Sequence, residues 1–80
     1  MSEYIATFHT HLSALMSSRT LQEKGIPARM MPVPRKLSSS CGTCVRYLAE
    51  QAELEAMDAD VEAVYEKIGT EEYTLIKDYG

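Results

Sequence analysis

The chain has 80 residues, a net charge of −4 at pH 7, 45% hydrophobic residues and 25% charged residues. A chain of this length forms one small domain, residues 1–80, and buries only about 60–65% of its unfolded surface, which leaves no room for a deep substrate cavity. The composition therefore excludes a disordered chain and disfavours a self-contained enzyme.

The charge is divided unevenly along the chain. Residues 1–47 contain six basic and two acidic residues, a net charge of +4, whereas residues 48–80 contain two basic and ten acidic residues, a net charge of −8. The basic residues form no run and alternate with no aromatic side chains, so the sequence predicts no binding to nucleic acid. It also lacks a ~20-residue apolar run and a secretory signal, which predicts no membrane association and a cytoplasmic location.

The first half of the chain predicts a strand, a helix and a second strand. β-Branched and aromatic residues at Tyr4–Phe8 favour a strand. Thr10 is a suitable N-cap for a helix over about 11–24, where apolar residues recur at helical spacing. Residues 28–33 favour a second strand, which two prolines terminate or confine to a sheet edge because proline has no N–H to donate.

The second half predicts a loop, two strands, a helix and a short apolar remnant. Proline, three consecutive serines and a glycine make residues 34–44 a loop. Residues 45–48 favour a third strand, and the Ala, Glu, Leu and Met of residues 50–58 favour a second helix. Residues 61–68 alternate as a fourth strand, and residues 73–76 are an apolar segment that can add an edge strand.

The resulting order is β-α-β-β-α-β, which predicts an α+β domain of the ferredoxin-like split β-α-β type, with two helices on one face of an antiparallel sheet. In this arrangement the first and third strands are antiparallel neighbours, so the end of the first lies beside the start of the third. An alternative interpretation begins a helix at the cysteines, because Cys41, Cys44 and Leu48 also fit an apolar helical stripe.

The predicted topology brings reactive and polar residues to one edge of the sheet. Two thiols come just before the third strand, and two imidazoles and a helix N-terminus follow the end of the first strand beside it. Neighbouring cations and a helix N-terminus favour the thiolate, which is the nucleophilic form of cysteine. The candidate reactive residues are Cys41 and Cys44, and the candidate supports for their anion are His9, Thr10, His11, Arg35, Lys36, Ser38, Ser39, Ser40 and Gly42.

The Cys-x-x-Cys spacing leaves several kinds of chemistry open. One thiol can resolve a bond that the other forms, as in a thiol–disulfide or redox-sensing module. The pair can also ligate zinc with one or both histidines, although the predicted elements need no metal to fold, so we assign no metal and no cofactor. A third interpretation is a non-catalytic interaction domain whose acidic segment, residues 50–66, docks a basic partner.

The chain resembles a small bacterial family described as selenium/sulfur carrier-like, formerly a domain of unknown function. The resemblance covers about residues 3–68, and its most specific part is the Pro-Val-Pro-Arg-x-Leu-Ser-x-x-Cys-Gly segment at residues 32–42. It implies an α+β fold and a Cys41 that carries sulfur or selenium, with Cys44 as a resolving thiol.

The same resemblance implies a partner, namely a donor such as a cysteine desulfurase or a selenium-transfer enzyme. The Cys-Pro-x-Pro signature of the tRNA-thiolation sulfur carriers is absent from the chain, so equivalence to those proteins is not implied. An exposed edge strand would also allow two copies to pair as a homodimer.

Overall fold

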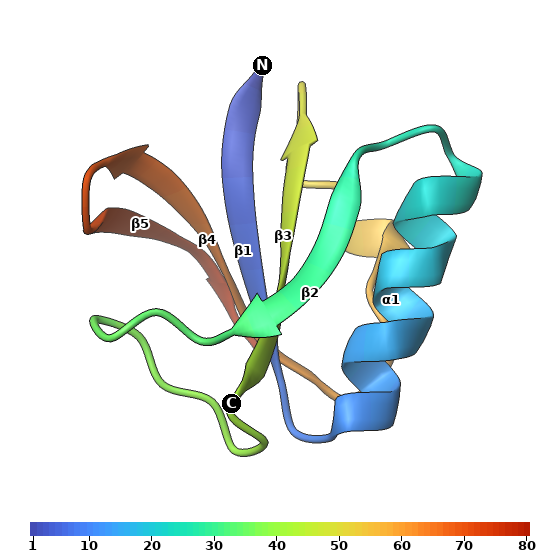
Figure 1. Ribbon diagram of the computed structural model, residues 1–80, viewed down its shortest axis with the longest axis horizontal. Coiled ribbons are helices and arrows are strands. Elements are labelled where there is room, and N and C mark those ends of the chain that lie inside the picture. Colours follow the sequence, from blue (N-terminus) through green and yellow to red (C-terminus); the bar gives the residue numbers. More distant parts are fainter.

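A five-stranded antiparallel sheet with one helix against it forms the fold, as the computed structural model of residues 1–80 shows (Figure 1). The order of strands across the sheet is β2-β3-β1-β4-β5. The elements are β1 (Ser2–Phe8), α1 (His11–Glu23), β2 (Ala28–Pro32), β3 (Thr43–Ala49), the 3-10 turn η1 (Leu54–Ala56), β4 (Val61–Gly69) and β5 (Glu72–Asp78).

The α+β class and the antiparallel sheet are confirmed, but the second predicted helix is wrong. Of residues 50–58, only the three residues of η1 are helical, so the two-helix ferredoxin-like arrangement is not confirmed. Isolated helices shorter than about 12–15 residues are marginal even with good helix formers. Tertiary contacts override the propensity here, because the Tyr47 hydroxyl donates to the Ala52 carbonyl and Glu53 adopts a left-handed φ of 55°.

The alternative helix at the cysteines is also wrong, because residues 43–49 form β3. This strand pairs with β1 in antiparallel register, with Thr7 opposite Cys44 and Tyr4 opposite Tyr47. The apolar remnant at residues 73–76 lies within β5, an edge strand that pairs with β4. No helix in the chain is long and apolar enough to cross a membrane.

The hydrophobic core lies between the sheet and α1. Alternate residues of the central strand β1, Tyr4, Ala6 and Phe8, belong to the buried core cluster, as strand periodicity requires. Tyr4 stacks on Tyr47 of β3 with ring centroids 5.3 Å apart. The remaining buried members of the cluster are Ala14, Leu21, Val45, Ala49, Ala56, Val61 and Val64.

Both ends of α1 are closed by capping interactions. Thr10 is the N-cap as predicted, and its hydroxyl oxygen accepts a hydrogen bond of 3.1 Å from the Ser13 N–H. At the other end, Gly25 at φ 80° donates to the Gln22 carbonyl and Ile26 donates to the Leu21 carbonyl. This pair of bonds is a Schellman motif, which turns the chain from α1 towards β2.

Candidate functional site

The loop of residues 33–42, which contains Cys41, closes against the place where three strand ends meet. Antiparallel pairing sets the end of β1 beside the starts of β3 and β4. Within the loop, the Gly42 N–H donates to the Ser39 carbonyl at 3.3 Å and the Val33 N–H donates to the Gly42 carbonyl at 3.1 Å. Gly42 adopts φ 74°, a left-handed conformation that glycine tolerates without steric cost.

Cys41 is half-buried and packs against the rim of the hydrophobic core. Its Sγ donates to the Thr43 carbonyl at 3.5 Å and lies 3.7 Å from the Ser39 hydroxyl oxygen. The thiol is unbonded to any other cysteine. Cys41 is therefore a free thiol with partial solvent access and with polar partners on one side.

The hydroxyl proton of Ser39 has three neighbours that can accept it. The Phe8 carbonyl lies 2.9 Å from the hydroxyl oxygen, the Thr43 carbonyl 3.3 Å and the Cys41 sulfur 3.7 Å. A hydroxyl has one proton to donate, so the shortest bond, to Phe8, occupies it while the cysteine is a neutral thiol. When the sulfur becomes an anion, rotation of this hydroxyl is the nearest way to supply a donor.

Ser40, Glu62 and His9 form a second polar cluster at the loop. The Ser40 backbone N–H and hydroxyl donate to the two carboxylate oxygens of Glu62 at 3.0 and 2.6 Å. His9 Nδ1 lies 3.2 Å from Glu62 Oε2. Partial burial raises the pKa of Glu62, but the hydrogen bonds from Ser40 and the nearby imidazole outweigh it and leave the pKa below its ordinary value.

Cys44 lies in a different environment from Cys41. Its side chain is 0% exposed, and its Sγ donates weakly to the Pro32 carbonyl at 3.7 Å. Burial, with a smaller contribution from the charge of Cys41, raises the pKa of Cys44 to about 11. Cys44 is therefore a protonated, inaccessible thiol at neutral pH, and Cys41 is the accessible one.

The other predicted site residues divide into those near the loop and those that make no contact there. His11 Nδ1 lies 3.4 Å from the Thr43 hydroxyl, which places the start of α1 beside the start of β3. The hydroxyl of Thr10 is already used as the helix cap. Arg35, Lys36 and Ser38 are exposed and make no side-chain hydrogen bond or ion pair, so their support of a sulfur anion stays a prediction.

The zinc alternative finds no ligand set in this arrangement. No three His, Cys, Asp or Glu side chains come together in a way that could hold a metal ion. Beside the loop there is instead an open hollow of about 290 Å³, and His11 and two methionines of β2 are among its walls. The residues that line this hollow are His11, Met30, Met31, Pro32, Gly42 and Thr43.

Sequence reasoning missed Glu62, the acidic partner of the loop. The residue lies in β4 between buried Val61 and Ala63, and it is 19% exposed at its side chain. Acidic residues are depleted in strands, so a carboxylate between two apolar residues at the start of this strand was an available signal. Nothing in the sequence indicated that its partner would be Ser40.

Comparison with known proteins identifies the family. Residues 3–71 match the family described as "Putative Se/S carrier protein-like". The chain belongs to this family. The resemblance noted in the sequence is thereby confirmed, and the family match includes the whole Cys41 loop, β3 and β4.

A relative of this Se/S carrier-like chain is known in Escherichia coli. It is the uncharacterized protein YtiA, which is 31% identical over 45 residues, or 56% of this chain and 53% of the relative. The chain thus spans about half the length of the curated relative that it matches. No solved structure matches the chain.

Proposed function

We propose that this protein carries sulfur or selenium on Cys41, as a persulfide or selenopersulfide, and passes the atom to a partner enzyme. One observation carries the proposal: Cys41 is an accessible free thiol in a loop of polar donors, whereas Cys44 is buried and protonated. The family description supports the same function. A carrier with one working thiol fits this arrangement better than a dithiol redox pair does.

Loading is a transfer of one sulfur atom from a donor persulfide. The Cys41 thiolate attacks the outer sulfur of the donor, the new S–S bond forms at Cys41, and the S–S bond of the donor breaks. The donor leaves as a thiolate, so charge and electrons balance without an external oxidant. Selenium follows the same course, with an S–Se bond formed at Cys41.

The Ser39 hydroxyl supports the charged sulfur. It lies 3.7 Å from Cys41 Sγ and needs only a rotation about its C–O bond to redirect its proton from the Phe8 carbonyl. The nearby carboxylate of Glu62 accepts a hydrogen bond from the Ser40 hydroxyl and lies 3.2 Å from His9 Nδ1. The loop therefore offers the Ser39 hydroxyl as a donor to the sulfur anion, and the neighbouring carboxylate of Glu62 is bonded to Ser40 instead.

The donor is a cysteine desulfurase or a selenium-transfer enzyme, because these present an outer sulfur or selenium atom to a thiol. We place the exchange in the cytoplasm, where thiols stay reduced. Arg35 and Lys36 are exposed on the same loop and unpaired, which suits them to contact an acidic surface of the donor.

Intact-mass measurement after incubation with a cysteine desulfurase and cysteine tests the proposal. The wild type and the Cys44→Ser variant should each gain the mass of one sulfur atom, about 32 Da, and the gain should be reversed by a reducing agent. Cys41→Ser should gain nothing. An adduct that persists in Cys41→Ser, or its absence from the wild type, would refute the carrier function.

A further inference from the structure

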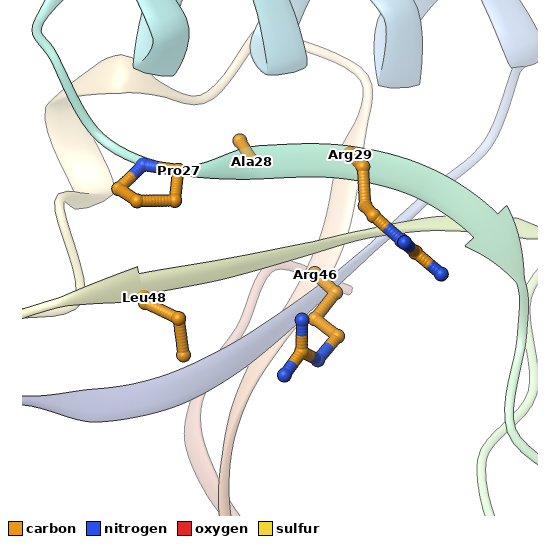
Figure 2. A pocket seen from close by; sticks show the side chains of 5 residues that line it. All are labelled: Pro27, Ala28, Arg29, Arg46 and Leu48. Carbon is orange, nitrogen blue, oxygen red and sulfur yellow. The ribbon is translucent and has the colours of Figure 1, made fainter.

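Two arginines face each other on the side of the sheet that α1 does not cover. Arg29 of β2 and Arg46 of β3 are register partners in an antiparallel pair, and the side chains of directly opposed residues lie about 4.5–5.5 Å apart at Cβ. Figure 2 shows both guanidinium groups pointing away from the helix, whereas Ala28 points towards it. The two cations therefore share one patch of surface.

An open hollow of about 250 Å³ adjoins the two arginines. At its other end Pro27 and Leu48 form an apolar wall, and Leu48 points to the same side as the guanidinium groups (Figure 2). A small ligand with a charged group and a short apolar part matches this combination of two cations and an apolar wall.

The charge of this patch is not balanced within the protein. Arg46 Nε donates to Glu3 Oε2 at 2.6 Å, and Lys67 Nζ lies 3.9 Å from the same oxygen. Arg29 makes no ion pair and no side-chain hydrogen bond. Arg46 and Lys67 thus share the carboxylate of Glu3 and Arg29 has no acidic partner, so these four residues together carry a charge of +2 on a chain whose net charge is −4.

Like charges opposite each other on neighbouring strands destabilise a sheet. A bound anion would remove this repulsion, and guanidinium groups donate in a fork that matches the oxygens of phosphate and carboxylate. A local charge of +2 corresponds best to a dianion. A phosphomonoester or inorganic phosphate is close to dianionic at neutral pH, whereas a carboxylate carries a single charge.

We propose that Arg29 and Arg46 form a binding site for a phosphate-type oxyanion, with Pro27 and Leu48 contacting any apolar group attached to it. The site lies on the face of the sheet opposite α1, and it does not use Cys41. It therefore goes beyond the carrier function, and Cys41→Ser should bind the anion as the wild type does.

Titration followed by amide NMR shifts tests the site, with inorganic phosphate and phenyl phosphate as two separate probes at constant ionic strength set by NaCl. We expect saturable shifts at β2 and β3. Tighter binding of phenyl phosphate would identify an ester as the natural ligand class, and equal binding would identify the free ion. Arg29→Gln should weaken either probe at least about tenfold, because it removes charge-assisted hydrogen bonds.

Arg19→Gln is the matched control, because Arg19 is also exposed and also makes no ion pair. This variant should change the affinity less than about twofold, as expected for a surface charge far from the ligand. Arg46→Gln should weaken binding as Arg29→Gln does. Linear, non-saturating shifts in the wild type, or equal losses in Arg29→Gln and Arg19→Gln, would overturn the site.

Discussion

The Ser39→Ala substitution tests whether a specific hydrogen bond holds the Cys41 loop in place or whether the serines only make the loop polar. Ser39 is half-buried and donates to the Phe8 carbonyl at 2.9 Å, which ties the loop to the end of β1. Its neighbour Ser38 is exposed and makes no hydrogen bond. Ser38→Ala is therefore a matched control, because it makes the same chemical change in the same loop without removing a contact.

The expected loss follows from the bonds removed. A hydrogen bond contributes about 0.5–1.5 kcal/mol net, and a partly buried carbonyl left without its donor adds to the cost, so Ser39→Ala should destabilise the fold by about 1–2 kcal/mol. In a domain of this size each kcal/mol lowers Tm by about 4–8 °C. Ser38→Ala should stay within about 0.5 kcal/mol of the wild type.

Urea unfolding followed by circular dichroism measures both variants. The midpoint should fall in Ser39→Ala without a change in the slope m, since the surface exposed on unfolding stays the same. Reaction of Cys41 with iodoacetamide supplies a second readout, and its rate should fall in Ser39→Ala because the sulfur anion loses its nearest donor. Equal midpoints for the two serine variants would refute the stabilising role of the hydrogen bond from Ser39 to the Phe8 carbonyl.

Three further predictions follow from the site and its surroundings. Iodoacetamide should label Cys44 only after unfolding. The free energy of unfolding should fall as pH rises from 9 towards 11, because the thiol of Cys44 ionises in the unfolded chain while the buried thiol stays protonated. Cys44→Ala should flatten this pH dependence. Glu62 has a pKa below 4.5 in the fold, so its contribution to stability is present above pH 4.5 and is lost as pH falls through the folded value. Glu62→Gln should remove this part of the acid unfolding curve measured by circular dichroism. Gly42→Ala should cost about 1–2 kcal/mol in urea unfolding, through backbone strain alone, because φ is 74° and no atom lies within 4 Å of the added Cβ.

Most of the fold was predictable because its elements carry local signals. The β-branched and aromatic residues of β1 and the caps of α1 are signals that depend on residues close in sequence. The absence of the second helix could not be predicted, because residues 50–58 are good helix formers. Their backbone is instead held by distant partners: the Asp58 N–H donates to Ser17 Oγ at 2.8 Å, and the Ser13 hydroxyl donates to Asp58 at 2.8 Å.

The candidate site was predictable in outline and not in detail. Antiparallel pairing of β1 with β3 brings His9 and the Cys41 loop together, as the order of elements predicts. Which side chains meet there depends on loop geometry that the sequence does not encode locally. Ser40 pairs with Glu62 across 22 positions in the chain, and Arg35 points to no partner at all.

The two cysteines show that the placement of the sulfurs in a Cys-x-x-Cys motif depends on the secondary structure of the segment that contains them. In a helix, residues three apart share a face, so a Cys-x-x-Cys pair presents two sulfurs to the same partner. Here residue 44 lies within β3, where neighbours alternate between faces, and Val45 takes the position facing α1. Cys44 is therefore directed to the opposite face and buried, whereas Cys41 precedes the strand, packs on the helix side and keeps solvent access. Because the Cys44 side chain is 0% exposed and its Sγ donates to the Pro32 carbonyl, the same strand geometry that leaves Cys41 accessible opposes the use of Cys44 as its resolving thiol.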